Sequence, residues 1–214
     1  MKTIRQLVTI LVILACAIPA AASRLETVKV ESESMHKQID VSVVLPDSYG
    51  ARPLPVVYLL HGYGDNNLCG YLSYTNVRQY ADMFDVVLVI PDGGTNWYFD
   101  SPVDPTIRYE TFVSSELIKY IDKNYLTDAR RERRAVTGLS MGGHGALYLA
   151  IRHQDVFGAA GSMSGGVDFR PFPEKWDIKL RLGDQKTHKE NWDKNTVMAQ
   201  LPLLKDGALQ LIID

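Results

Sequence analysis

The stretch Ala135-Val136-Thr137-Gly138-Leu139-Ser140-Met141-Gly142-Gly143-His144-Gly145-Ala146 decides the fold that we predict for this chain. Its first three residues are apolar and predict a buried strand, and residues 143–150 predict a helix. Between them lies a G-x-S-x-G pattern centred on Ser140. A turn from strand to helix at such a serine is so tight that flanking glycines relieve the clash, and it aims the helix N-terminus at the hydroxyl. The context therefore favours a nucleophile elbow at Ser140 over a chance match.

A second motif, His61-Gly62-Tyr63-Gly64, directly follows the apolar run Pro55-Val56-Val57-Tyr58-Leu59-Leu60. The run predicts a central strand, and the glycines after it allow a backbone N–H to turn toward the serine. Acyl transfer needs two such donors for the oxyanion, and removal of one costs about a hundred- to a thousand-fold in rate. We expect these donors to be the N–H of Tyr63, or of a neighbour in its loop, and the N–H of Met141.

Composition limits the function classes that the chain can serve. The 214 residues are 46% hydrophobic and 22% charged, which is typical of a globular chain with one core. A net charge of −2 gives no electrostatic reason to expect nucleic acid or an anionic membrane as a partner. We expect no metal and no cofactor.

The first 22 residues are expected to be a secretory signal peptide. Lys2 and Arg5 precede an apolar run over residues 7–18, and Ala20-Ala21-Ala22 supplies small residues for cleavage after Ala22. The run is shorter than the ~20 residues that span a bilayer. The mature protein is therefore predicted to begin at residue 23 and to be secreted or periplasmic, with no membrane association after cleavage.

The two cysteines leave one alternative for the N-terminus. A lipoprotein would be modified at Cys16, which follows Ile13-Leu14-Ala15, but the residues after Cys16 stay apolar and lead into a better cleavage site. If Cys16 leaves with the signal peptide, Cys69 has no partner for an internal disulfide. We interpret Cys69 as a packed or loop thiol.

Strand and helix patterns alternate along the rest of the chain. Strands are expected at residues 28–31, 39–45, 56–60, 86–90, 135–137, 157–163 and 209–213. Helices are expected at residues 76–84, 109–125 and 143–150. The alternation predicts an α/β fold, with a mostly parallel sheet and helices on both faces. Function is then expected at the carboxyl ends of the strands, where the loops after Leu60, Ile90 and Leu139 converge.

Two further segments interrupt this alternation. Residues 167–204 are polar, contain tryptophan and have little periodicity, so we interpret them as a cap-like excursion within a domain that covers residues 23–214. Arg130-Arg131-Glu132-Arg133-Arg134 is predicted to be a solvated turn of mixed charge.

Four segments, in this order, carry a resemblance to a known family. They are His61-Gly62-Tyr63-Gly64, Asn96-Trp97-Tyr98-Phe99-Asp100-Ser101-Pro102, Tyr109-Glu110-Thr111-Phe112 with Glu116-Leu117-Ile118, and Gly138-Leu139-Ser140-Met141-Gly142-Gly143. They resemble the esterase family of α/β-hydrolases, which includes S-formylglutathione hydrolases (esterase D), tributyrin esterases, feruloyl and acetylxylan esterases, and antigen 85 mycolyltransferases. The resemblance covers roughly residues 25–214, and the N-W-Y and G-L-S-M-G-G segments are its most specific parts.

The resemblance implies roles for several residues. It implies an α/β-hydrolase fold and a Ser-His-Asp hydrolase, with Ser140 as nucleophile and with Tyr63 and Met141 as oxyanion donors. It places Trp97 and Tyr98 beside the acyl pocket, near His61 and Gly62, although simple core packing of Trp97 and Tyr98 is the alternative.

The acid and the histidine of the implied triad are not found in the expected order. In this fold the acid follows the serine and the histidine follows the acid, after the last strands. The sequence ends at Leu211-Ile212-Ile213-Asp214, so we expect a domain that is truncated at its C-terminus. Its five histidines are His36, His61, His144, His153 and His188. Only His188 lies in a loop that could approach Ser140, and Asp214 could be the acid only if its loop is short.

The function expected from these patterns is that of a secreted serine carboxylic-ester hydrolase that works through an acyl-Ser140 intermediate. Its substrates would be short acyl esters, or acetyl and feruloyl esters on polysaccharide. A catalytically incomplete fragment, a non-catalytic relative that binds acyl or carbohydrate ligands, and an antigen 85-like acyltransferase are the alternatives. The sequence does not indicate an oligomeric state.

Overall fold

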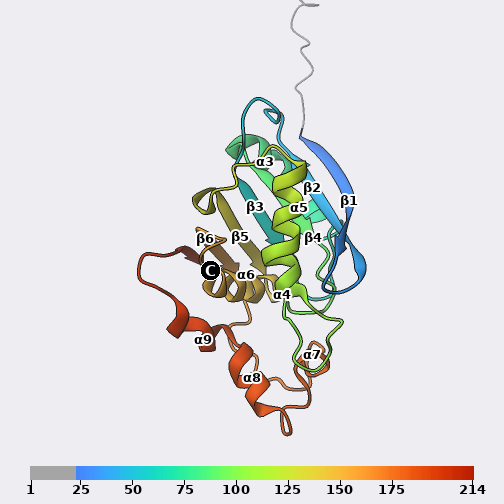
Figure 1. The fold of residues 1–214 in the computed structure, drawn as a ribbon, viewed down its shortest axis with the longest axis vertical. Helices are drawn as coiled ribbons and strands as arrows, with labels where there is room; N and C mark the ends of the chain where they lie inside the picture. The colour runs from blue at the N-terminus through green and yellow to red at the C-terminus, as the bar shows by residue number, and fades with distance from the viewer. Residues whose placement is uncertain (1–22) are drawn as a thin grey trace, which may run out of the picture.

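The computed structural model describes residues 23–214, and a seven-stranded sheet forms its centre (Figure 1). The strands are β1 (Arg24–Ser32), β2 (Lys37–Leu45), β3 (Val56–Leu60), β4 (Val87–Pro91), β5 (Arg134–Leu139), β6 (Ala159–Met163) and β7 (Gln210–Ile213). Their order in the sheet is β1-β2-β4-β3-β5-β6-β7. The pairs β1–β2 and β2–β4 are antiparallel, and all the later pairs are parallel. The predicted strands are thus present, and the mostly parallel sheet is confirmed.

Helices connect the strands and extend the chain beyond the sheet. They are α2 (Tyr71–Tyr74), α3 (Val77–Phe84), α4 (Tyr109–Thr111), α5 (Leu117–Asn124), α6 (Met141–Arg152), α7 (Ile178–Leu182), α8 (Lys189–Asn195) and α9 (Val197–Gln200). A π-helical segment, Phe112–Glu116, joins α4 to α5. The helix expected over residues 109–125 therefore exists with one wider turn, which the periodicity did not predict.

The helices cover both faces of the sheet, as expected. On one face, Leu117 and Ile121 of α5 and the apolar residues of α6 join the main core with Val56 and Tyr58 of β3. On the other face, Val77 and Ala81 of α3 pack with neighbours from β2, β3 and β4. Figure 1 shows α5 and α6 in front of the sheet. The apolar positions of β2, β3 and β4 thus divide between two separate cores.

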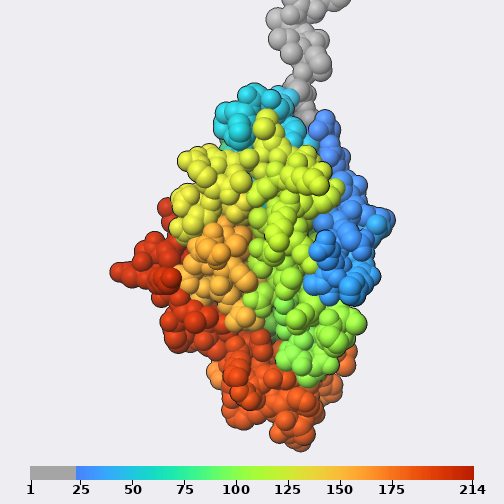
Figure 2. Space-filling model, in the orientation of Figure 1, coloured from blue at the N-terminus to red at the C-terminus, as the bar shows by residue number. Residues whose placement is uncertain are grey.

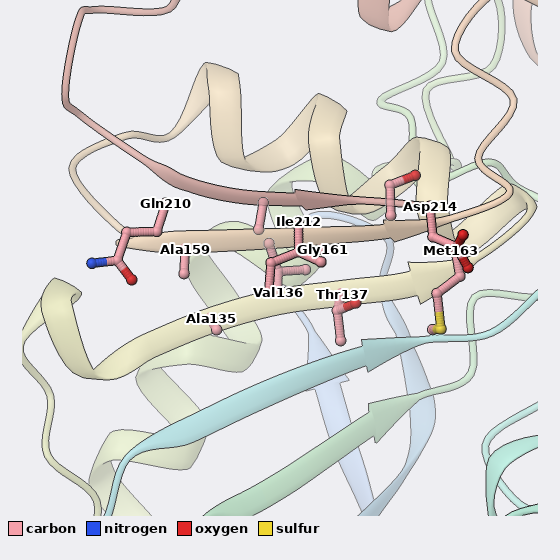
Figure 3. A pocket seen from close by; sticks show the side chains of 11 residues that line it. Ala135, Val136, Thr137, Ala159, Gly161, Met163, Gln210, Ile212 and Asp214 are labelled. Atoms are coloured by element: carbon pink, nitrogen blue, oxygen red, sulfur yellow. The ribbon is translucent and has the colours of Figure 1, made fainter.

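The face that α3 covers is open over β5, β6 and β7 (Figure 3). A hollow of about 380 Å³ lies there, lined mainly by small or apolar residues: Ala135, Val136, Thr137, Ala159, Ala160, Gly161, Ser162, Met163, Gln210, Ile212 and Asp214. Strand β7 forms the sheet edge, and its Ile212 is 76% exposed. This hollow contains no histidine or cysteine, so it offers less chemistry than the strand ends described below.

The expectation of a solvated arginine turn is wrong for one residue. Arg134 is buried, and its guanidinium donates to the Asp122 carboxylate at 2.6 Å and to the Val156 carbonyl at 3.0 Å. Arg134 begins β5 beside the C-terminal part of α5, and there its charge is paired. Local sequence does not reveal this, because the partner is 12 residues away.

The segment 167–204 contains more regular structure than its sequence predicts. It forms α7, α8 and α9 at the lower end of the molecule, where orange and red atoms cover the base of the surface in Figure 2. Trp192 of α8 is fully buried there and donates its indole N–H to the Gly183 carbonyl at 2.8 Å. Long-range aromatic packing, which periodicity does not register, therefore orders this segment.

The predictions for the N-terminus fall on residues 1–22 and lie outside the described residues. Within residues 23–214, no helix combines the length and apolar character needed to cross a bilayer.

Cys69 is an exposed thiol in the loop before α2, in agreement with its interpretation as a loop residue.

Candidate active site

Ser140 occupies a sharp turn between β5 and α6. Its φ of 54° lies in the left-handed region, which a residue with a side chain adopts only at a cost of about 1–3 kcal/mol. The Ser140 N–H donates to the Met163 carbonyl of β6 at 2.8 Å, and its carbonyl accepts from His144 N–H at 3.0 Å. These bonds hold the turn in place and leave the Ser140 side chain exposed.

The glycines of the motif are required by close backbone contacts. A Cβ at Gly142 would lie 1.9 Å from the Leu60 carbonyl oxygen, and a Cβ at Gly138 would lie 2.4 Å from the Gly142 carbonyl carbon. The end of β3 therefore packs directly against the first turn of α6. This contact brings the loop that follows Leu60 next to the serine.

That loop, residues 61–64, is anchored at its start by a buried histidine. The Gly93 N–H donates to His61 Nε2 at 2.8 Å, so the Nδ1 nitrogen carries the proton and donates to the Gly62 carbonyl at 2.8 Å. A Cβ at Gly62 would lie 3.9 Å from the Cβ of Ser140. His61 thus positions the loop beside Ser140, while its ring nitrogens are occupied by backbone groups.

Two backbone N–H groups near the serine are available to a ligand. Within residues 23–214, neither the Tyr63 N–H nor the Met141 N–H has an intramolecular hydrogen-bond acceptor. Met141 is the first residue of α6, where N–H groups have no partner inside the helix. Such groups, together with the helix dipole, favour a negatively charged oxygen.

A cavity of about 240 Å³ opens at Ser140. Its lining residues are Tyr63, Trp97, Ser140, Ser164, Gly166, Asp168, Phe169, Phe172 and Trp176. Tyr63, Trp97, Ser140 and Ser164 come from the segments that follow β3, β4, β5 and β6, so the predicted convergence of strand ends is present. The walls are mostly aromatic, which suits an apolar acyl group next to the hydroxyl.

Several residues that the sequence places at the pocket lie behind its wall instead. Tyr98 is fully buried, its ring contacts Gly93 and Gly145, and its hydroxyl donates to the His61 carbonyl at 3.2 Å. His61, Gly62 and the buried side chain of Met141 also do not line the cavity. Tyr98 is therefore a core residue, whereas its neighbour Trp97 lines the cavity.

The aromatic wall that sequence reasoning missed comes from the excursion. Phe169, Phe172 and Trp176 line the cavity together with Ser164 and Asp168. The sequence signal for them was their close spacing, because all three lie within residues 169–176 of a polar, aperiodic segment. The charged member, Asp168, is paired with Arg170 at 2.6 Å, and the hydrogen bonds from that guanidinium lower the pKa of the carboxyl.

No histidine lines the cavity in the part of the chain that the structure describes. His36 is exposed in the β1–β2 hairpin, and His188 is exposed with its Nδ1 at 2.9 Å from the Thr187 hydroxyl. His153 contacts Glu110 at 2.9 Å, at the far end of α6 from Ser140. Asp214 lines the hollow over β5–β7 and not this cavity.

His144 lies one turn into α6, where it belongs to the core. It is fully buried, its Nδ1 is 3.1 Å from the Gly166 carbonyl, and its ring contacts Trp97, Phe99 and Phe169. Burial lowers its pKa to about 4. The ring is therefore neutral in the folded protein at neutral pH and is a packing element rather than a base.

The buried His144 predicts a specific loss of stability in acid. Its pKa is about 4 in the folded chain and 6.5 in a model peptide, so the unfolded chain binds the proton first as pH falls. The free energy of unfolding is expected to have its full value above pH ~6.5 and to be lower by about 3 kcal/mol at pH ~4. The variant His144→Asn, which keeps a donor for Gly166, should show a flatter dependence of urea unfolding on pH. Equal slopes in both proteins would contradict this assignment.

Comparison with known proteins assigns these features to a family. The family described as "Putative esterase" matches residues 32–212, which include the elbow, the 61–64 loop and the cavity wall. The chain belongs to this esterase family. The resemblance carried by the motifs is thereby confirmed, and so is the α/β-hydrolase fold.

Individual relatives of this chain carry names that refer to different activities. The chain is 36% identical over 135 residues to the esterase MT1326 of Mycobacterium tuberculosis, and the match covers 61% of this chain and 30% of that protein. It is 31% identical over 202 residues to the diacylglycerol acyltransferase/mycolyltransferase Ag85B of Mycolicibacterium smegmatis, covering 84% of this chain and 60% of that protein. The chain therefore spans less than two thirds of either relative.

Solved structures of other proteins show the same fold. A ferulic acid esterase superposes with a TM-score of 0.70 and 27% identity, covering 87% of this chain and 74% of that one. An S-formylglutathione hydrolase from Agrobacterium tumefaciens superposes with a TM-score of 0.71 and 18% identity, covering 91% and 87% of the two chains. The second likeness shows the fold alone.

Proposed function

We propose that this member of the esterase family is a secreted serine carboxylic-ester hydrolase in which Ser140 is the nucleophile. The observation that carries the proposal is the juxtaposition at the elbow. Ser140 is exposed, has a strained φ and lines an aromatic cavity. Within residues 23–214, the N–H groups of Tyr63 and Met141 beside it have no intramolecular hydrogen-bond acceptor. A strained backbone conformation of this kind persists only where the surrounding structure enforces it, and such conformations cluster at functional sites.

The proposed reaction has two steps. Ser140 Oγ attacks the ester carbonyl carbon and loses its proton to a base, while the carbonyl oxygen becomes an oxyanion that accepts from the two N–H groups. The C–O bond then breaks and the alcohol leaves with a proton, which gives acyl-Ser140. A water molecule attacks the acyl carbon in the same way, and the carboxylic acid and the free hydroxyl are released.

The base is the component that the described residues do not supply. An unassisted serine hydroxyl is a weak nucleophile at neutral pH. Because none of the histidines among the described residues lines the cavity, we propose that the general base is not among the residues around Ser140 in this structure.

The cavity suggests which esters fit. Its walls include Trp97, Phe169, Phe172 and Trp176, which favour a flat, apolar acyl group such as feruloyl, although an acetyl group also fits in the volume. The likeness to a ferulic acid esterase supports this choice. We propose aryl or short acyl esters, including those on polysaccharide, as the substrate class.

Acyl transfer to an acceptor other than water is the second candidate function. The specific observation in its favour is the match over 84% of this chain to a protein named diacylglycerol acyltransferase/mycolyltransferase. Both reactions share acyl-Ser140, so they differ only in the second step. Product analysis with added alcohols distinguishes them.

Secretion remains a proposal that rests on the basic, apolar and small-residue order of residues 1–22. N-terminal sequencing of exported protein should begin near Ser23. A mature N-terminus at a lipid-modified Cys16 would overturn it.

Chemical rescue tests the proposed function. Because no imidazole lies beside Ser140 within residues 23–214, added imidazole should raise the hydrolysis of p-nitrophenyl acetate by the chain at least about tenfold above the rate without it. Imidazole itself hydrolyses this ester, so the matched control is Ser140→Ala at the same imidazole concentration. Equal imidazole-dependent rates in the two proteins would sink the proposal and favour a non-catalytic binding protein.

A further inference from the structure

A hydrogen bond joins two loops that border the cavity. The Tyr63 hydroxyl donates to Asp177 Oδ2 at 2.8 Å, and the two residues are 114 positions apart. Tyr63 lines the cavity, as does Trp176, the residue before Asp177. The bond therefore connects the 61–64 loop to the segment that leads into α7.

The Tyr63 side of this bond has few other restraints. Gly62 and Gly64 flank the residue, and Gly64 has a φ of 82° that only glycine adopts easily. The Tyr63 ring is 37% exposed, and Asp177 is the hydrogen-bond acceptor of its hydroxyl. This carboxylate also raises the pKa of Tyr63. Apart from the turn that the Asp65 N–H closes by donating to the Gly62 carbonyl at 3.2 Å, the bond to Asp177 is thus the polar contact that holds Tyr63.

The Asp177 side is held in an unfavourable local conformation. Trp176 and Asp177 have φ values of 55° and 54°, so two successive residues with side chains are left-handed. Asp177 is the N-cap of α7, where an aspartate normally accepts from the first N–H groups of the helix, yet it makes no such bond. Its carboxylate is directed to Tyr63 instead.

Firm contacts hold the segment around Asp177 against the N-W-Y loop. The Trp97 indole N–H donates to the Trp176 carbonyl at 3.0 Å, and the Ser101 hydroxyl donates to the Arg181 carbonyl at 2.6 Å. Trp97 is 3% exposed and Ser101 is also buried. The segment is therefore a fixed support to which the glycine-flanked loop is attached.

We propose that Asp177 is a positioning residue, which acts through the Tyr63 hydroxyl to hold the Tyr63 N–H in place beside Ser140. This inference rests on the proposed function, because it gives the N–H its role as oxyanion donor. Such a donor is effective only within a narrow distance of the oxyanion, about 2.7–3.1 Å. The hydrogen bond supplies a tertiary restraint on the glycine-flanked loop that carries this donor.

The test uses Tyr63→Phe, Asp177→Gly, the double variant and the conservative Asp177→Asn. Glycine accepts the left-handed φ of residue 177, so Asp177→Gly removes the carboxylate without added strain. The first readout is hydrogen exchange of the Asp65 N–H, which donates to the Gly62 carbonyl within the loop at 3.2 Å. Exchange should be faster in Tyr63→Phe and Asp177→Gly by about tenfold, with no further increase in the double variant.

The second readout is imidazole-supplemented hydrolysis of p-nitrophenyl acetate. Tyr63→Phe and Asp177→Gly should each lower kcat about tenfold and leave KM within about threefold, because the lost interaction belongs to the transition state. The double variant should be no worse than either single variant, and Asp177→Asn, which still presents an acceptor oxygen, should stay near the parent. Tyr74→Phe, at an 84% exposed ring outside the cavity, is the matched control for loss of a hydroxyl.

The two readouts separate the inference from the proposed function. Unchanged exchange at Asp65 in both single variants would overturn the role of Asp177, whatever the activity. Faster exchange with unchanged kcat would overturn it as well, because the loop would then move without effect on the donor. An inactive parent protein contradicts the proposed function, and the positioning role in catalysis falls with it.

Discussion

Replacement of Ser140 by alanine is expected to abolish covalent labelling of this protein by a fluorophosphonate probe in the presence of imidazole. The probe forms a bond to an activated hydroxyl, and Ser140 is the hydroxyl at the elbow that the cavity exposes. Mass spectrometry of the labelled protein should place the adduct on the peptide that contains Ser140. Hydrolysis of p-nitrophenyl acetate should fall in the variant to its residual rate, ~10³-fold above water at most.

The size of this effect depends on the base. The effects on rate of residues that act together in catalysis are strongly non-additive, so loss of the serine lowers the rate little when the base is already missing. Without imidazole, Ser140→Ala and the parent protein should therefore have similar turnover, and they should separate when imidazole is added. Labelling that persists in the variant, or that maps to another residue, would contradict the assignment.

Ser140→Gly serves as the control for folding in this experiment. Glycine removes the same hydroxyl and adopts the φ of 54° at little cost, so the variant should be more stable than Ser140→Ala by about 1 kcal/mol in urea unfolding. Loss of labelling in both variants, together with this gain in stability, would exclude unfolding as its cause. The same comparison measures the strain stored at the elbow.

The substitution Gly142→Ala is expected to destabilise the fold by about 3 kcal/mol or more. Helix propensity alone predicts the opposite, because alanine is favoured over glycine inside a helix by up to ~1 kcal/mol. The added Cβ, however, would lie 1.9 Å from the Leu60 carbonyl oxygen and 2.8 Å from that of His61. Both contacts are backbone atoms of β3 and its loop, which cannot rotate away.

The matched control for Gly142→Ala is Gly207→Ala. Gly207 has a φ of 67° and no atom within 4 Å of an added Cβ, so its substitution adds backbone strain but no clash. It should cost only about 1 kcal/mol. Urea unfolding of the two variants measures the difference, and a Gly142→Ala protein as stable as Gly207→Ala would contradict the close packing of β3 on α6.

Much of the framework was predictable because it depends on local periodicity. The strand at residues 56–60 is predicted within its observed bounds, since a run of apolar, β-branched residues ends at a glycine loop. The elbow was also predictable, because its steric demands require glycine at fixed distances from Ser140. The π-helical turn at Phe112–Glu116 was not predictable from periodicity, because the regular 3.6-residue spacing does not indicate a wider turn. The paired charge of Arg134 was not predictable either, because its partner Asp122 lies on another element.

The sequence by itself determined the fold class, the family and the position of Ser140 between a strand and a helix, because these follow from apolar spacing and from where glycine must stand. Only the tertiary structure decided what surrounds that serine. It brought Phe169, Phe172 and Trp176 from an aperiodic segment to the cavity and put Tyr98 behind the wall. It also buried His144 completely among aromatic rings of the core. These placements depend on which side chains from distant parts of the sequence pack together, and the spacing of apolar residues along the chain does not indicate those contacts.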